Sequence, residues 1–214
     1  VGPDAAPSLY AYYERATRVN WRDSWADDAT GVWVRGGHAL DQHDHQDRGH
    51  VNWIVRGKPI LIEAGTPSYD HPLMMSHFTS GMGHNVLQIG TVSPDPPYPA
   101  DDYLRLPGWQ DPHVIAPITI QRLDAAGGDV RVDVKSAYAG LEHWSRHVTW
   151  TSAELIVEDE VLLAGSGQDI LIFRWHLGTP ATANITGEGT RYVVKSAHAE
   201  ITLEGSVPLT ISTA

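Results

Sequence analysis

The fold is best indicated by the stretch His50-Val51-Asn52-Trp53-Ile54-Val55-Arg56-Gly57-Lys58-Pro59-Ile60-Leu61-Ile62-Glu63-Ala64-Gly65. Two apolar runs stand on either side of Gly57, and a short glycine-containing segment between such runs predicts a β-hairpin. Residues 130–135 carry a second signal, because valines alternate there with charged side chains, as in a strand with one buried face.

Similar segments follow one another along most of the chain. They are residues 31–36, 84–89, 142–151, 154–163, 169–177, 190–196, 199–204 and 207–213. Roughly a dozen strands predict an all-β fold, a large antiparallel two-sheet β-sandwich, which residues 1–214 form as a single domain. Only residues 8–18 predict a helix, with Ser8 as its N-cap. The proline-rich residues 91–113 predict a long surface loop.

The composition excludes several classes of protein. The chain has 26 acidic and 15 basic side chains among 214 residues, a formal net charge of −11. This argues against a nucleic-acid partner, which needs clustered lysine and arginine. The absence of cysteine excludes disulfides and thiolate metal ligands. No apolar run approaches the ~20 residues of a membrane helix, and no signal peptide follows Val1, so we interpret the sequence as a mature or excised piece.

The histidines point to chemistry in the first half of the chain. Seven of the 12 fall between residues 38 and 84, and they are densest in Asp41-Gln42-His43-Asp44-His45-Gln46-Asp47. On an extended chain the imidazoles and carboxylates at alternate positions of this stretch share one side, which favours a metal or acid–base site. Glu63 and His84 follow on strand-like segments. A sulfur-free His–Glu–His set suits zinc or another divalent cation, with one position left for water or substrate.

A cupin barrel is one alternative, because His-x-His, a later Glu and a final His also describe the metal site of that family. In cupins the Glu follows the second His by only a few residues. Here Glu63 comes 18 positions after His45, and this spacing makes a cupin-like metalloenzyme acting on a small molecule the second choice. A carbohydrate-binding β-sandwich without catalytic activity is a further alternative.

Several motifs occur in an order that resembles the heparinase II/III-like family of polysaccharide lyases. They are Trp21-Arg-Asp-Ser-Trp25, Trp33-Val-Arg-Gly-Gly37, His43-Asp-His45-Gln-Asp47, Val55-Arg-Gly-Lys-Pro-Ile-Leu-Ile-Glu-Ala-Gly65, Tyr69 and His84-Asn85-Val86. The resemblance covers about residues 18–90. It implies that this chain is the C-terminal β-sandwich of such a lyase and that an N-terminal α/α toroid lies upstream. We therefore expect a periplasmic or secreted location, with a cytoplasmic one left open.

The resemblance also implies an activity and a set of site residues. Members of the family cleave uronate-containing polysaccharides by β-elimination, so the expected partner is an acidic polysaccharide or oligosaccharide. Carried over to this sequence, His43 lies at the active cleft, and His45, Glu63 and His84 bind zinc; the family usually has Asp where this chain has Glu63. Because the α/α domain completes the active site in the family, we expect little lyase activity from this chain alone.

β-Elimination from a uronate needs a neutralised carboxylate, a base for the proton at C5 and an acid for the leaving oxygen at C4. His43 suits one of these roles and Tyr69 is a candidate neighbour. Arg22 and Arg48 are candidates for the substrate carboxylate. Trp53 and Trp109 are candidates for stacking on sugar rings. The metal has two interpretations: a catalytic ion polarises substrate or water, whereas a structural ion clamps the early loop onto the strands of Glu63 and His84 and thereby positions His43. We favour the structural role, because His43 and His45 point out from adjacent positions of one short signature.

Overall fold

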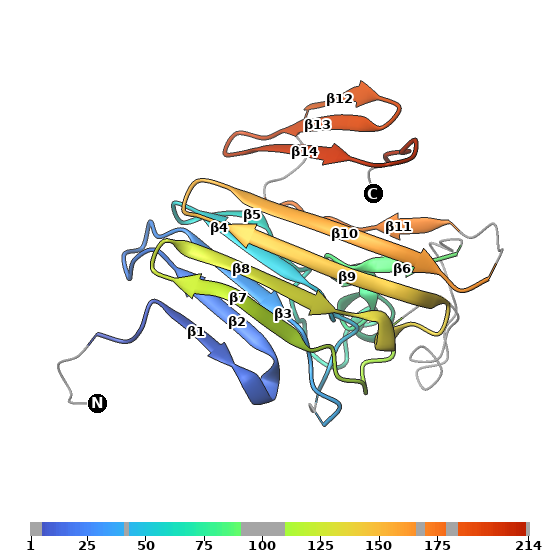
Figure 1. The fold of residues 1–214 in the computed structure, drawn as a ribbon, viewed down its shortest axis with the longest axis horizontal. Coiled ribbons are helices and arrows are strands. Elements are labelled where there is room, and N and C mark those ends of the chain that lie inside the picture. Colours follow the sequence, from blue (N-terminus) through green and yellow to red (C-terminus); the bar gives the residue numbers. More distant parts are fainter. Residues whose placement is uncertain (1–5, 41–42, 91–109, 166–169, 179–183, 213–214) are drawn as a thin grey trace.

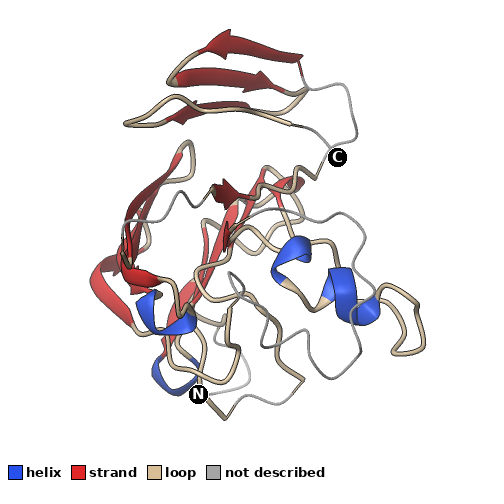
Figure 2. Cartoon of the chain, turned by 90° about the vertical axis from the view of Figure 1, so that its right-hand side faces the viewer, coloured by secondary structure: helices blue, strands red, loops and turns tan. Residues whose placement is uncertain are grey.

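The computed structural model describes residues 6–40, 43–90, 110–165, 170–178 and 184–212. In this part of the chain, antiparallel strands dominate and helical structure is limited to short turns (Figures 1 and 2). The strands are β1 (Tyr10–Tyr13), β2 (Arg18–Arg22), β3 (Gly31–Arg35), β4 (Val51–Val55), β5 (Lys58–Leu61), β6 (Leu87–Ile89), β7 (Ile118–Asp124), β8 (Gly127–Asp133), β9 (Leu141–Trp150), β10 (Leu155–Leu163), β11 (Leu171–Phe173), β12 (Asn184–Glu188), β13 (Arg191–Lys195) and β14 (Glu200–Glu204).

The described strands divide among four sheets. Strands β1 to β5 form a five-stranded sheet in sequence order, and β7 to β10 form a four-stranded sheet. Strand β6 pairs with β11, and β12 to β14 form a separate meander beyond the edges of the larger sheets (Figures 1 and 2). The all-β class and the antiparallel pairing are confirmed. The expected arrangement was two sheets, whereas the structure divides the strands among four.

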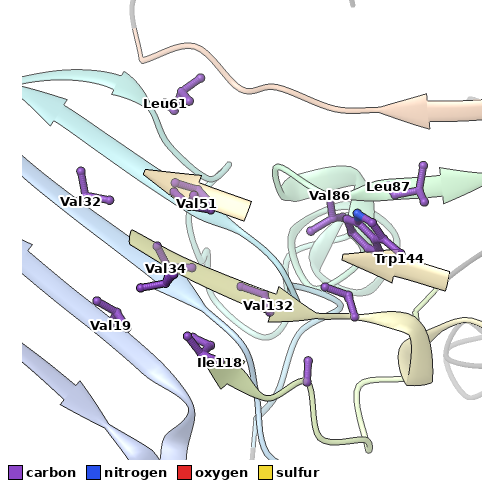
Figure 3. Packing of buried hydrophobic residues seen from close by; sticks show 14 of the residues in the cluster. Val19, Val32, Val34, Val51, Leu61, Val86, Leu87, Ile118, Val132 and Trp144 are labelled. Carbon is purple, nitrogen blue, oxygen red and sulfur yellow. The ribbon is translucent and has the colours of Figure 1, made fainter. Parts of the chain in front are cut away.

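The two larger sheets share one hydrophobic core (Figure 3). The indole of Trp21 on β2 meets that of Trp150 on β9 edge-on at 6.5 Å, and its Nε1 donates to the Asp124 carbonyl at 2.9 Å. The alternating valines of 130–135 contribute Val130, Val132 and Val134, each without exposed surface. Their burial confirms the prediction of a strand with one buried face.

The hairpin around Gly57 is also confirmed. Strands β4 and β5 pair on either side of it, and Gly57 adopts a φ of +71°, which glycine tolerates without strain. Residues 174–178 then pair with the edge of β5, through hydrogen bonds such as Gly178 N–H to the Ile60 carbonyl at 3.1 Å. This pairing joins the β6–β11 pair to the five-stranded sheet.

The predicted helix over residues 8–18 is wrong. The segment contains strand β1 and a single 3-10 turn, Glu14–Ala16. Tyr10 and Tyr12 pack against the core at alternate positions, and the Tyr12 hydroxyl donates to the Ile118 carbonyl at 3.2 Å. The Ser8 hydroxyl caps no helix, since it donates to the Tyr10 carbonyl at 2.7 Å. Pairing with β2 and this burial decide the conformation.

Other boundaries differ from the expectation. Strands β2, β7 and β12 lie outside the segments predicted from the alternation pattern, and the described residues of 207–213 contain no strand. Most of the predicted loop over 91–113, residues 91–109, lies outside the described residues. None of the helices in the described ranges is long and apolar enough to span a membrane. The single-domain organisation of residues 1–214 stays a prediction.

Candidate functional site

A cleft of about 420 Å³ lies over the outer face of the five-stranded sheet. Side chains alternate along a strand, so the positions between the buried valines of β2, β3 and β4 face outward. The loop of residues 43–50, which leads into β4, and the segment after β5 supply the rest of the lining. The lining residues are Arg18, Asn20, Trp33, Val34, Arg35, His43, Asp44, His45, Asp47, His50, Asn52, Glu63 and Thr66.

His43 and Tyr69 meet at the rim of this cleft. The Tyr69 hydroxyl and His43 Nδ1 are 2.8 Å apart, a hydrogen-bond distance, although 26 positions separate the two residues. Both side chains are exposed. His43 has a φ of +55°, which is uncommon for a residue other than glycine. Strained backbone of this kind concentrates at functional sites, because the surroundings must hold it in place.

His84 lies beneath the cleft and has no exposed surface. Its Nε2 is 3.2 Å from His45 Nδ1, and its Nδ1 is 3.5 Å from Glu63 Oε2. His84 Nδ1 is buried and makes no hydrogen bond among the described residues. Two nitrogens on one tetrahedral zinc, with bonds of ~2.0–2.1 Å, lie roughly 3.3 Å apart. The facing nitrogens of His45 and His84 therefore fit a metal ion.

His50 is a member of the cluster that the sequence did not single out. His50, Glu63 and His84 each place a possible ligand atom within 4.8 Å of the other two. The backbone N–H of Asn85 donates to His50 Nδ1 at 2.8 Å, and His50 Nε2 is 3.0 Å from Asn52 Oδ1. Because a backbone N–H only donates, a neutral His50 carries its proton on Nε2 and gives it to Asn52. Both nitrogens are thus already in use.

The cluster keeps its donors in the protonation states that metal binding needs. Burial lowers the pKa of His45, and the nearby His84 lowers it further. Burial and the same neighbour lower the pKa of His50 to about 4. The contact with His84 holds the pKa of Glu63 below its usual value despite partial burial. At neutral pH the site therefore offers uncharged His45 and His50 beside an ionised carboxylate, and metals bind these forms.

Buried charges hold the loop of residues 43–50 from below. Arg48 has no exposed surface and forms ion pairs with Asp44 and Asp47. Arg35 pairs with the same two carboxylates. Burial alone would raise the pKa of Asp47, but Arg35, together with His84 and Arg48, outweighs it and holds the pKa below its usual value. The two guanidinium groups thus neutralise the two carboxylates at the base of the loop.

Backbone carbonyls take the remaining donors of Arg48. Its guanidinium donates to His45 O at 3.0 Å, to His38 O at 3.2 Å and to Val114 O at 3.3 Å, and also to Pro112 O. It lies over Gly37, where a Cβ would be 2.7 Å from Arg48 Nε. Gly37 has a φ of +134°, so both its backbone and this contact require glycine.

Asn85 fixes the position of its neighbour His84. Its side-chain amide donates to Val51 O at 2.9 Å and to Ile62 O at 3.0 Å. The backbone carbonyl of Asn85 accepts from the buried guanidinium of Arg146 at 2.6 Å. The amide thus ties β4, the segment after β5 and the start of β6 together directly beneath the cluster.

Comparison with known proteins places the chain. The sequence model described as heparinase II/III-like, C-terminal, matches residues 20–210. The chain belongs to this family. This assignment removes the cupin alternative, and it confirms the resemblance on which the site residues rest. No curated protein sequence matches the chain.

Solved structures of a heparan sulfate lyase and of heparinase III share the fold of this heparinase-like domain. Heparan sulfate lyase HepC from Pedobacter heparinus superimposes with a TM-score of 0.62 at 16% identity, over 91% of this chain and 28% of that one. Heparinase III superimposes with a TM-score of 0.59 at 16% identity, over 94% of this chain and 34% of that one. The chain therefore spans about a third of the length of these enzymes.

Of the four residues predicted to bind substrate, the structure of this heparinase-like domain describes three, and their surroundings differ. Arg48 is buried beneath the cleft, and Trp53 is only 8% exposed and packs in the core, so neither presents a surface to a ligand. Arg22 lies on the outer face of β2, with its guanidinium 4.3 Å from the centre of the Trp25 ring. Trp109 lies outside the described residues.

Proposed function

We propose that the chain is the β-domain of a polysaccharide lyase that cleaves uronate-containing polysaccharide by β-elimination. The observation that supports this most directly is the hydrogen bond between Tyr69 and His43 at the rim of the cleft, in a member of the heparinase II/III-like family. The reaction breaks the C5–H and C4–O bonds of the uronate, forms a C4–C5 double bond and returns a proton to the leaving oxygen. A neighbouring tyrosine and histidine suit both proton transfers.

The two side chains divide these steps in our proposal. Tyr69 gives its hydroxyl proton to His43 Nδ1 and takes the proton from C5 of the sugar. The same hydroxyl then passes a proton to the leaving oxygen, and His43 returns the proton on its Nδ1 to the Tyr69 oxygen. The cation formed on His43 lies close to the charge that develops on the substrate, which stabilises the transition state.

We propose zinc, or another divalent cation, as the cofactor, held by His45, Glu63 and His84. His45 and His84 supply the facing nitrogens, and Glu63 lies against the other nitrogen of His84, where a carboxylate orients a metal-bound imidazole or reaches the ion by rotating its side chain. His50 is not a ligand in this proposal, because both its nitrogens have hydrogen-bond partners. A bound ion would supply positive charge and fix His45, and with it the neighbouring His43.

The remaining parts of the proposal concern partners and location. An N-terminal α/α domain of the same enzyme completes the active site, consistent with the short span of this chain relative to HepC and heparinase III. The acidic polysaccharide binds between that domain and this one. The enzyme works in the periplasm or outside the cell, where such polysaccharides occur.

The test uses the full enzyme with its α/α domain, beside the isolated 214-residue chain. The unsaturated product is followed by its ultraviolet absorbance on heparan sulfate and on other uronate polysaccharides. We expect His43→Ala and Tyr69→Phe to lower kcat by about 10²–10⁴-fold, with unchanged circular dichroism. Tyr192→Phe is the matched control, because it also removes one tyrosine hydroxyl but lies on β13 and lines neither hollow of the outer face. Full activity in either variant, or in the isolated chain, would contradict the proposal.

A further inference from the structure

The indole of Trp33 lies against the outer face of the five-stranded sheet. A Cβ built on Gly31 would be 2.7 Å from Trp33 Cη2 and 3.0 Å from Cζ3, so the six-membered ring covers Gly31. Gly31 has no positive φ, and the backbone there is compatible with any residue. What requires glycine at this position is the space that the indole occupies. The indole therefore lies over Gly31 on the outer face of the sheet, where Trp33 lines the cleft.

Two amides flank this ring in one row across the sheet. Asn20 on β2 and Asn52 on β4 are the direct cross-strand partners of Trp33. Partners of this kind have Cβ atoms roughly 4.5–5.5 Å apart on the same face. Asn52 already accepts from His50 Nε2 through its Oδ1, which orients its NH₂ group. An aromatic platform between amide donors and acceptors matches the apolar face and the hydroxyl edge of a pyranose ring.

The row connects two hollows of the surface. The cleft of about 420 Å³ that contains His43 includes Asn20 and Trp33 in its lining. A second hollow of about 150 Å³ shares these two residues and continues to Arg22 and Trp25. The combined surface follows the outer face of β2, a strand of five residues that spans about 16 Å, and so extends past a single sugar ring. The carboxylates of Asp44, Asp47 and Glu63 balance the arginines of this surface, so the acidic character of the ligand comes from the proposed lyase function.

We propose that Trp33, with Asn20 and Asn52, forms a sugar-stacking subsite that holds a pyranose ring of an acidic oligosaccharide beside the His43–Tyr69 pair. The identity of the ligand rests on the proposed lyase function. The arrangement of Trp33 between the two asparagines does not depend on that function. The subsite positions the chain of sugars along β2, so that binding energy from rings that do not react orients the one that does.

The experiment measures binding by calorimetry to the 214-residue chain. The probes are a tetrasaccharide of alternating glucuronate and N-acetylglucosamine, and the neutral cellotetraose. Loss of an aromatic stacking partner is expected to weaken binding of the uronate probe about tenfold in Trp33→Ala. Trp33→Phe is expected to lose less, and Gly31→Ala is expected to weaken binding although Trp33 remains, because its Cβ displaces the indole. The control is Ile156→Ala, an exposed residue on the outer face of the other large sheet.

The outcomes separate the subsite from the lyase function. Unchanged affinity in Trp33→Ala, in a variant with native circular dichroism, overturns the subsite and leaves the lyase function standing. No binding of either probe by the wild-type chain also overturns the subsite. If cellotetraose binds as tightly as the uronate probe and Trp33→Ala weakens both equally, a sugar-stacking site at Trp33 is supported. The same result would refute the preference of that site for an acidic sugar.

Discussion

Arg48→Met tests whether buried charges hold the loop that carries His43 and His45. In the native chain Arg48 and Arg35 balance Asp44 and Asp47, and Arg48 has no exposed surface. Methionine keeps much of the volume but leaves one cation facing two anions, and it leaves carbonyl groups of the loop without donors. Removing one partner of a buried ion pair typically costs about 3–5 kcal/mol. We expect a loss of about 4 kcal/mol in the free energy of unfolding, a large part of a typical total of ~5–15 kcal/mol.

Urea denaturation followed by tryptophan fluorescence measures this loss. Combining Arg48→Met with Asp44→Asn leaves one cation facing one anion. The double variant is therefore expected to lose less free energy of unfolding, by at least ~1 kcal/mol, than the sum of the losses of the two single variants. Arg22→Met, on the outer face of β2, is the control and is expected to stay within about 0.5 kcal/mol of wild type. Near-native stability in Arg48→Met, or strictly additive losses, would refute the charge-balance reasoning.

Three other predictions follow from the site. His45→Ala is expected to abolish zinc uptake, measured by elemental analysis. His50→Asn is expected to retain zinc, because the new side-chain oxygen still accepts from the Asn85 N–H. The reverse pattern would show that His50, and not His45, is the ligand. Asn85→Ala is expected to lower the free energy of unfolding by about 3 kcal/mol, because two buried carbonyls lose their donor, and a loss no larger than that of Asn52→Ala would count against this role. Gly37→Ala is expected to lose about 2 kcal/mol through its strained φ and the displaced guanidinium, and an unchanged melting temperature would contradict this.

The sequence carried most of the strand pattern because burial imposes a period of two. Residues 130–135 show that period, whereas the hairpin was indicated by two apolar runs on either side of Gly57, and the structure has strands at both places. Residues 8–18 show the limit of the method. A possible N-cap at Ser8 favoured a helix, but nothing in the local sequence records that β2 and the core would pair with Tyr10 and Tyr12. Tertiary contacts, absent from a local pattern, decided that conformation.

The sequence identified many of the residues of the site, but it assigned the correct role to only some of them. The motifs indicated His43 and Tyr69, but only the fold brings their side chains to 2.8 Å. Arg48 was misassigned because an arginine in a polar loop is normally exposed. One signal could have corrected this. Arg48 follows Asp44 and Asp47 in a short loop after Gly36-Gly37, a composition that lets a guanidinium be buried with its partners.

The loop of residues 43–50 is held from two sides, and this explains how an exposed, strained His43 keeps its place. On one side Arg48 binds the carbonyl of His45 and the carboxylate of Asp44. On the other side the imidazole of His45 faces that of His84, which the Asn85 amide contacts tie to the core. His43 lies two positions before His45, so both restraints reach it through one short segment of backbone. The proposed metal ion between His45 and His84 would tighten only the second restraint. It would then order the cleft, whereas the buried ion pairs of Arg35 and Arg48 would still stabilise the loop without it.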